Sequence, residues 1–123
     1  MSTARQQSGR RAEELAAEFL RAAGCEILHS NYRRRLGELD IVARADGVLV
    51  IAEVRTRASS AYGGAAASVD RRKQRRITRA ASQLLQQRAD LAALPVRFDV
   101  LVVSDPHGPS PAIEWICHAF EAC

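Results

Sequence analysis

The feature that most constrains this chain is a pair of β-rich runs on either side of the dipeptide Asp46-Gly47. The runs cover residues 37–44 and 48–55, and valine, isoleucine and leucine recur in both. Asp-Gly is a strong signal for a two-residue hairpin turn, because both turn positions need a positive φ angle. The sequence therefore predicts one antiparallel β-hairpin over residues 37–57.

The two-residue turn sets which side chains of the hairpin face each other. In this register Asp40 falls opposite Glu53, and Glu38 falls opposite Arg55. Directly opposed side chains have Cβ atoms about 4.5–5.5 Å apart, where like charges destabilise a sheet. A hard divalent cation with oxygen ligands, Mg²⁺ or Mn²⁺, would relieve the repulsion between the two carboxylates. A solvated charged face is the alternative, and a three-residue loop would shift the pairing by one residue.

A first helix and a short strand are predicted ahead of the hairpin. Apolar residues recur at intervals of three and four over residues 9–23, with Ser8 in position to cap the helix. Glu13 lies at the edge of this apolar stripe, where a carboxylate is usually solvated. A strand over residues 25–33 and a basic loop at 33–35 lead into the hairpin. The loop is either an ordinary charged turn or a phosphate contact, and the nearby carboxylates favour the contact.

A long helix is predicted from its N-cap Asp70 to about Ala89. Lys73 lies four residues before Ile77 and therefore on the inward apolar stripe, in the first turn, where a cation opposes the helix dipole. A residue that breaks a local rule often marks a functional site. A lysine that snorkels out of the stripe is the competing explanation. Four arginines lie on the outer faces, as a basic surface or a solvated one: Arg72, Arg75, Arg76 and Arg79.

The remaining elements are a loop and two strands. Residues 58–68, small side chains around Tyr62, predict a flexible loop before the long helix. The apolar run 96–103 is typical of a buried central strand, which a right-handed βαβ crossover would place parallel to the second hairpin strand. A last strand is predicted over residues 112–118.

The crossover also predicts where the candidate functional side chains meet. A crossover helix begins near the C-terminal end of the strand before it, so Glu53, Arg55 and Lys73 should gather at one edge of the sheet. The sequence contains no glycine-rich phosphate loop and no Ser-His-Asp arrangement that would offer a competing site.

Composition narrows the class of protein. A chain of 123 residues with 47% hydrophobic residues is expected to form one domain, here residues 9–123 behind a flexible segment 1–8. The sequence has no apolar run of membrane-spanning length and no signal-peptide core, and its three cysteines form no CxxC pair. We therefore expect a cytoplasmic protein without membrane contact. The formal charge of +4 favours a polyanionic partner.

Taken together, this order of elements resembles the restriction-endonuclease-like core, whose signature is the PD-(D/E)xK motif. More closely, the chain resembles the bacterial YraN family of uncharacterised proteins, grouped with the archaeal Holliday-junction resolvases. The resemblance spans nearly the whole chain from residue 9 and rests on Gly9 with Glu13, Asn31-Tyr32-Arg33, Gly37-Glu38-Leu39-Asp40, residues 53–57, Lys73, Arg97-Phe98-Asp99-Val100 and Ala119-Phe120.

The resemblance implies an α/β fold, with a mixed central sheet flanked by helices, and a nuclease-type site. Asp40 and Glu53 would be metal ligands for Mg²⁺ or Mn²⁺, and Glu13 would be a further carboxylate. The lysine of the motif would orient water or neutralise charge in the transition state. Arg55 stands at that position, and an arginine stays protonated, so it can stabilise phosphate charge but cannot act as a base. Ala12 stands where the resemblance leads us to expect a glycine.

Two functional hypotheses follow from these residues. The first is a metal-dependent nuclease that acts on DNA, including branched structures, with Arg55 or Lys73 as the catalytic cation. The second is a catalytically impaired nucleic-acid-binding protein of the same fold, and we favour the first. A homodimer is an open alternative to a monomer. In both cases the phosphate contacts are expected from Arg33, Arg34, Arg35, Arg57, Arg72, Arg75, Arg76 and Arg79.

Overall fold

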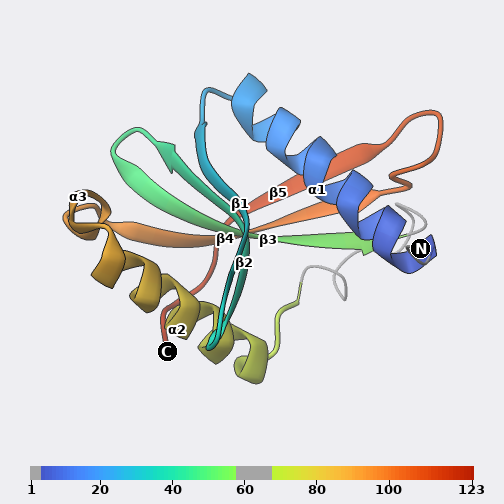
Figure 1. Ribbon diagram of the computed structural model, residues 1–123. Helices are drawn as coiled ribbons and strands as arrows, with labels where there is room; N and C mark the ends of the chain where they lie inside the picture. The colour runs from blue at the N-terminus through green and yellow to red at the C-terminus, as the bar shows by residue number, and fades with distance from the viewer. Residues whose placement is uncertain (1–3, 58–67) are drawn as a thin grey trace.

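The structure is a computed structural model that describes residues 4–57 and 68–123. Within these ranges a five-stranded sheet in the order β1-β2-β3-β4-β5 is covered by α1 on one face and by α2 on the other (Figure 1). The elements are α1 (Ala4–Ala22), β1 (Glu26–Arg34), β2 (Gly37–Ala45), β3 (Val48–Arg57), α2 (Arg71–Gln87), α3 (Ala89–Ala92), β4 (Val96–Ser104) and β5 (Ala112–Phe120).

The sheet is mixed, as predicted. Strands β3 and β4 pair in parallel, and the helix between them, α2, makes the predicted crossover. The pairs β1–β2, β2–β3 and β4–β5 are antiparallel. This architecture is compatible with a restriction-endonuclease-like core.

Two apolar layers hold the helices to the sheet. On one face Ala12, Ala16, Ala17 and Leu20 of α1 pack against residues of the central strands such as Ile41. On the other face a second cluster centres on the buried stripe of α2, with Ile77, Ala80, Ala81 and Leu84. The small residues of α1 let that helix lie close to the sheet, which brings its polar edge near the ends of β2 and β3.

The hairpin between β2 and β3 has the predicted turn and the predicted register. Asp46 and Gly47 have φ angles of 50° and 76°, as a two-residue hairpin turn requires. The ladder runs from Ala45↔Val48 to Ile41↔Ala52. It ends one residue short of Asp40 and Glu53.

Beyond that point the two strands part. β2 stays paired with β1 as far as the pair Arg34↔Gly37, and β3 stays paired with β4 to the pair Arg57↔Ser104. Figure 1 shows the β1–β2 hairpin turning toward α2 while β3 continues in another direction. The sheet is therefore forked between residue 40 and residue 53.

The fork overturns one prediction. Glu38 was expected opposite Arg55, but the β2–β3 ladder does not reach either residue. Glu38 instead pairs with Arg33 of β1, whose Nε atom lies 3.6 Å from its Oε2 atom. The extrapolated register fails here because it assumes that both strands stay in one ladder.

Several predicted boundaries also differ. Helix α1 begins at Ala4, so Ser8 lies inside the helix and does not cap it. Arg33 and Arg34 belong to β1, which leaves a tight turn before β2 in place of a basic loop. Residues 1–3 and the greater part of the predicted loop, with Tyr62, lie outside the described residues. In the described part of the chain, no helix combines the length and apolarity that a membrane span needs.

The tip of the β1–β2 hairpin rests on α2 at Gly37. This residue has a φ angle of 156°, and a Cβ atom there would lie 2.9 Å from the backbone oxygen of Arg76. A glycine is needed at this close approach of strand to helix. The tip of the hairpin that leaves β3 at the fork therefore packs directly on the backbone of α2.

Candidate functional site

The fork in the sheet opens into a polar cleft that four elements line. Its volume is about 560 Å³, and it is hollowed between the N-terminal half of α1, the parting ends of β2 and β3, and the first turn of α2. The charged side chains that line it are Glu13, Glu38, Asp40, Glu53, Arg55 and Lys73. The predicted catalytic and metal-binding residues therefore meet in one cleft.

Asp40 occupies the point where the ladder ends. Its side chain is nearly buried, at 8% exposure, and its Oδ2 atom accepts a hydrogen bond of 2.9 Å from the backbone nitrogen of Val54. Where the strands part, this N–H group of β3 takes the Asp40 carboxylate as its partner. The structure thus places Asp40 beside Glu53, as the register predicted, although no backbone pairing holds them together.

The carboxyl groups of Asp40 and Glu53 affect each other's pKa. Burial and the neighbouring charge of Asp40 raise the pKa of Glu53 to about 8, against the opposing effects of Lys73 and Arg55. Burial also raises the pKa of Asp40, while hydrogen bonds from Val54 and Glu53 lower it. Both pKa values are raised, so the two carboxyl groups are less readily ionised together than two exposed carboxyl groups would be.

Glu13 joins the same acidic group from α1. Partial burial and the charges of Asp40 and Glu38 raise the pKa of Glu13 to about 7, and Arg33 lowers it. From its spacing alone, Glu13 was expected to be solvated. The structure contradicts that interpretation, because α1 packs across the open end of the fork and turns this side chain into the cleft.

Lys73 reaches the acidic group from the other side of the sheet. Its Nζ atom lies 3.5 Å from Oε1 of Glu53, and the Lys73 side chain is 28% exposed. Asp70 caps the helix by accepting a hydrogen bond of 2.8 Å from the backbone nitrogen of Lys73. The predicted inward position of Lys73, close to Glu53, is confirmed.

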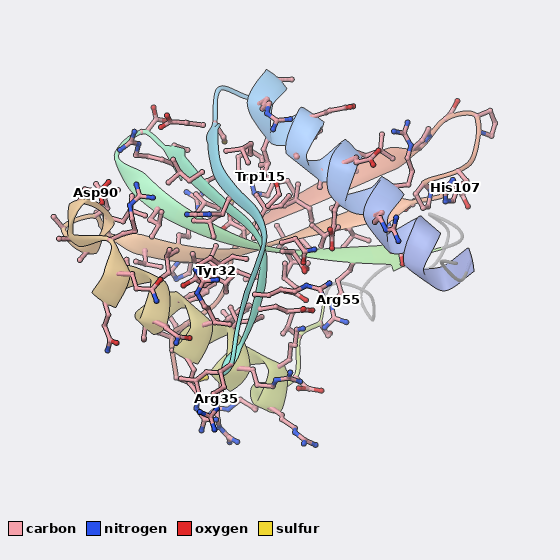
Figure 2. The ribbon with its side chains drawn as sticks, in the orientation of Figure 1. Tyr32, Arg35, Arg55, Asp90, His107 and Trp115 are labelled. Carbon is pink, nitrogen blue, oxygen red and sulfur yellow. The ribbon has the colours of Figure 1, made fainter. Side chains whose placement is uncertain are left out.

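Arg55 also lines the cleft, where Figure 2 labels it beside β3. Its Nε atom is buried and has no hydrogen-bond partner among the described residues. A buried donor without a partner is costly in a protein interior. Arg55 is thus a cation at the site with hydrogen-bonding capacity to spare for an anionic ligand.

The acidic group fits a divalent cation in its chemistry. Among the described residues, no cluster of three or more His, Cys, Asp or Glu side chains forms a ready-made metal site. Asp40 and Glu53, however, are nearly buried carboxyl groups whose pKa values are raised, and a cation bound between them would stabilise their charged forms. Oxygen ligands of this kind suit Mg²⁺ or Mn²⁺.

A basic face lies beside the cleft. We define it by seven exposed arginines on the β1–β2 tip and on α2: Arg33, Arg34, Arg35, Arg72, Arg75, Arg76 and Arg79. The contact of Gly37 with α2 brings the two sets together, and Figure 2 shows Arg35 beside the N-terminal half of that helix. Arg34 lies 4.3 Å above the Tyr32 ring, which orients it.

Arg57 lies apart from the basic face. Its Nε atom donates a hydrogen bond of 2.8 Å to Ser104, and its Nη2 atom lies 4.0 Å from Glu114. These contacts hold the end of β3 to β4 and β5. Arg57 was predicted to contact phosphate, and in the structure its side chain links β3 to the neighbouring strands.

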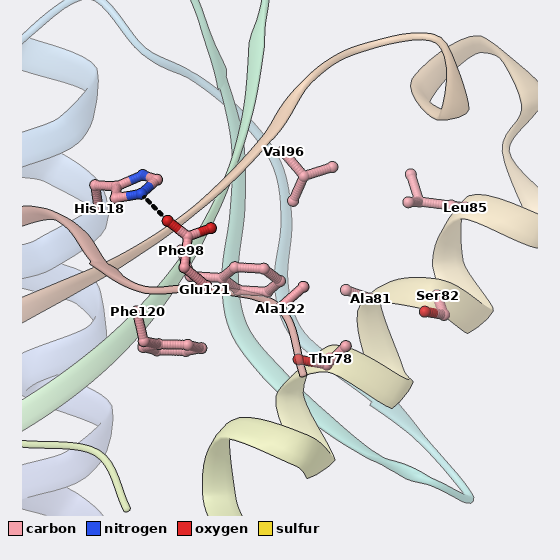
Figure 3. A pocket seen from close by; sticks show the side chains of 10 residues that line it. All are labelled: Thr78, Ala81, Ser82, Leu85, Val96, Phe98, His118, Phe120, Glu121 and Ala122. Carbon is pink, nitrogen blue, oxygen red and sulfur yellow. Dashed lines mark hydrogen bonds and ion pairs between the residues drawn. The ribbon is translucent and has the colours of Figure 1, made fainter. Parts of the chain in front are cut away.

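An apolar hollow on the α2 side of the sheet has different chemistry. It has a volume of about 160 Å³, and a hydrogen bond joins two of its lining residues, His118 and Glu121, near the C-terminal end of the chain (Figure 3). The remaining walls include Ala81, Leu85, Val96, Phe98 and Phe120. It brings together no acidic cluster with a cation, so the cleft at the fork is the stronger candidate site.

Sequence reasoning missed two contributors to the cleft. The backbone nitrogen of Val54 fixes Asp40, and nothing in a side-chain pattern identifies a backbone donor freed by a fork. Gly9 of α1 also lines the cleft. The family resemblance included Gly9 together with Glu13, but the predicted helix began at Gly9 and the sequence analysis gave this residue no part in the site.

Comparison with known proteins gives one consistent result. The family model described as "Uncharacterised protein family UPF0102" matches residues 12–103. A UPF0102 protein of Pseudomonas savastanoi pv. phaseolicola is 41% identical over 120 residues, which cover 98% of each chain. Similar proteins from Pseudomonas aeruginosa and Xanthomonas euvesicatoria pv. vesicatoria are each 45% identical, covering 93% and 99% of this chain and 92% and 98% of their own.

Proposed function

The chain belongs to the uncharacterised protein family UPF0102, and we propose that its cleft is the active site of a metal-dependent nuclease that acts on DNA. One observation carries the proposal: the nearly buried carboxyl groups of Asp40 and Glu53 line one open cleft, and the Lys73 Nζ atom lies 3.5 Å from Glu53 in the same cleft. Two acidic ligands and a lysine are the parts that hydrolysis of a phosphodiester needs.

The residues of the cleft divide the work of hydrolysis. Asp40 and Glu53 would hold Mg²⁺ or Mn²⁺, with Glu13 as a further carboxylate. A divalent cation bound there would polarise the phosphate and acidify a water molecule. Lys73 supplies a positive charge that offsets the negative charge gained by the phosphate as water attacks.

The basic face supplies the expected substrate contacts. Seven exposed arginines on two adjoining elements form a surface on which a phosphate backbone can lie. We propose DNA as the polyanion, with branched structures among the substrates, a cytoplasmic location for the protein, and a homodimer as a form to be tested.

Arg55 favours a second candidate function. This residue stands where the nuclease motif has lysine, and an arginine cannot act as a base. A catalytically impaired nucleic-acid-binding protein would keep the basic face and the fold. Lys73 distinguishes the two candidates. In a nuclease its amine would replace the lysine of the motif, so its loss should slow cleavage. In a protein that only binds DNA, its loss should have little effect.

The test is a cleavage assay with Mg²⁺ or Mn²⁺ on linear, nicked and branched DNA, under single-turnover conditions at saturating protein. Lys73→Ala should lower the cleavage rate at least about tenfold, or roughly 1.4 kcal/mol of barrier, because it removes the cation nearest the reacting phosphate. Its DNA affinity should stay within about threefold, since one contact is a small part of the binding. Arg55→Lys should keep or raise the rate.

The matched control is Arg72→Ala, which removes an exposed cation next to Lys73 in the same helical turn. At saturating protein this variant should cleave at the wild-type rate. If neither the wild type nor Arg55→Lys cuts any of these substrates, the enzyme proposal fails and the binding protein remains. If Lys73→Ala cuts as fast as the wild type, Lys73 has no part in the reaction.

A further inference from the structure

A smaller hollow adjoins the cleft between α1 and β1. Its volume is about 250 Å³, and its walls are Gly9, Arg10, Glu13, Asn31 and Arg33. Gly9 and Glu13 line the cleft as well, so the two spaces meet along one edge of α1. A chain molecule with its reacting group in the cleft could continue into this hollow.

Gly9 is a glycine that the fold does not need. It lies inside α1, where glycine weakens a helix relative to alanine. A Cβ atom at this position would meet no heavy atom of the described residues within 4 Å, so packing does not require its absence. Its φ angle is not among the positive ones, so backbone conformation does not require it either. A glycine at this position leaves room for the backbone of a ligand to approach the helix closely.

The side chain of Arg33 is oriented by its neighbours on the opposite wall of the hollow. Its Nε atom donates a hydrogen bond of 3.1 Å to Oδ1 of Asn31 and lies 3.6 Å from Oε2 of Glu38. The side chain is nevertheless 71% exposed. The guanidinium is therefore oriented by two neighbours and remains open to an anion from solvent.

The charges of the adjoining spaces differ. The cleft contains four carboxylates against two cations, whereas the hollow contains two arginines against the shared Glu13. A further hollow along α1, which shares Arg10 and Glu13, adds Glu14 and Glu18 against Arg21. The space between Gly9 and Arg33 therefore attracts phosphate by its own side chains, whereas the acidic cleft would need its bound divalent cation to do so.

We propose that the hollow formed by Gly9, Arg10, Asn31 and Arg33 binds the DNA phosphate next to the one that reacts in the cleft. Arg33 and Arg10 hold the phosphate oxygens, and Gly9 leaves room for the sugar-phosphate backbone to pass α1. This inference rests on the proposed function, because it extends the path of the same DNA strand. In this proposal, Gly9 and Arg33 together position the DNA strand over the acidic side chains of the cleft.

The test measures DNA binding without cleavage, in the presence of Ca²⁺. One uncharged methylphosphonate linkage is moved step by step along the strand, and each duplex is titrated with wild type and with Arg33→Gln. At one position along the strand, the methylphosphonate should lower the affinity of the wild type for the duplex about fivefold. At that same position it should leave the affinity of the Arg33→Gln variant unchanged. The control is Arg88→Gln, an exposed arginine paired with Asp90, which should show the wild-type pattern.

A second pair of variants tests the role of Gly9. Gly9→Leu should fill the hollow and lower DNA affinity about tenfold without lowering the melting temperature, since a Cβ atom there meets no heavy atom of the described residues within 4 Å. The control Ala22→Leu, at the exposed C-terminal end of the same helix, should bind as the wild type does.

Two results would overturn the inference and leave the proposed function standing. In the first, the losses of DNA affinity caused by Arg33→Gln and by the uncharged linkage add at every position of the linkage. In the second, the Gly9→Leu variant binds DNA as the wild type does. A wild-type protein that binds none of these duplexes would overturn the proposed function together with the inference.

Discussion

The protein buries carboxylates in two places and treats them in opposite ways. Asp99 of β4 is fully buried, and its two oxygens accept four hydrogen bonds. Two come from the Arg97 guanidinium at 2.8 and 2.9 Å, and the others come from Trp115 Nε1 and the backbone nitrogen of His118, each at 2.9 Å. At the fork, Asp40 accepts one hydrogen bond from a backbone N–H group, and Glu53 beside it is a second nearly buried carboxyl group.

The difference distinguishes a structural carboxylate from a functional one. Asp99 has a full set of donors and a bidentate cation, so nothing further is needed to keep its charge buried. Asp40 and Glu53 are also nearly buried, but their donors are too few for two negative charges. Such a pair is destabilising as it stands, and an added cation would relieve it. Local cost of this kind is expected at a site shaped for a ligand.

Removing the charge at each place should give the largest contrast. Asp99→Asn should lower the free energy of unfolding by about 3–5 kcal/mol, because it leaves the charge of Arg97 without a partner. The new amide NH₂ group would also face hydrogen-bond donors such as Trp115 Nε1. Asp40→Asn keeps an acceptor for Val54 and removes the repulsion with Glu53, so it should be neutral or stabilising. Urea unfolding at slightly alkaline pH and without metal measures both. Equal losses in the two variants would contradict the comparison.

Stability should depend on pH through the fork. The pKa of Glu53 is about 8 in the folded protein, against 4.5 for an unperturbed glutamate, so the folded state binds this proton more tightly. The stabilisation is complete below about pH 4.5 and is lost as pH rises through 8. The loss should amount to a few kcal/mol, taking roughly 1.4 kcal/mol per pKa unit.

Unfolding curves across this range, recorded without metal, measure the effect. The glutamine in Glu53→Gln cannot titrate, so this variant should show a flatter dependence of the free energy of unfolding on pH. Relative to the wild type, it should be more stable at alkaline pH than at acidic pH. Glu14→Gln, an exposed carboxylate on the same molecule, is the control and should leave the wild-type slope. A Glu53→Gln variant that keeps the full slope would show that the fork does not hold this proton.

The smallest expected effect concerns the basic face, which should act through charge alone. If its arginines contact phosphates, the logarithm of DNA affinity should fall with the logarithm of salt concentration by about 0.9 per contact on duplex. The variant Arg75→Gln/Arg79→Gln should therefore flatten the slope by up to about 1.8. Arg88→Gln, beyond the basic face, is the control. A wild-type affinity that is independent of salt would contradict both functional candidates.

Local sequence predicted the parts of this site that depend on local rules. The Asp46-Gly47 turn gave the register that brings Asp40 to Glu53, because turn type and register are linked. The inward lysine of α2 was found by its place in the apolar stripe, and the βαβ crossover placed it near Glu53. These features depend on a few neighbouring residues, so one sequence is enough to predict them.

The fork depends on contacts between elements, and therefore it was not predicted. Where the β1–β2 hairpin leaves β3, its tip meets the backbone of α2, since Gly37 lies against Arg76, 39 residues further along the sequence. Without the fork, Glu38 was expected opposite Arg55 and not beside Arg33. Glu13 was expected to be solvated because its spacing does not show which end of the sheet α1 covers.

The central claim is that Asp40 and Glu53 together hold a divalent cation, and thermal unfolding with and without Mg²⁺ or Mn²⁺ tests it most directly. Metal should raise the melting temperature of the wild type, because a ligand that binds only the folded state stabilises it. The response should disappear in Asp40→Asn/Glu53→Gln and persist in the exposed control pair Glu14→Gln/Glu18→Gln. A metal-induced shift of equal size in the wild type and in Asp40→Asn/Glu53→Gln would contradict the claim.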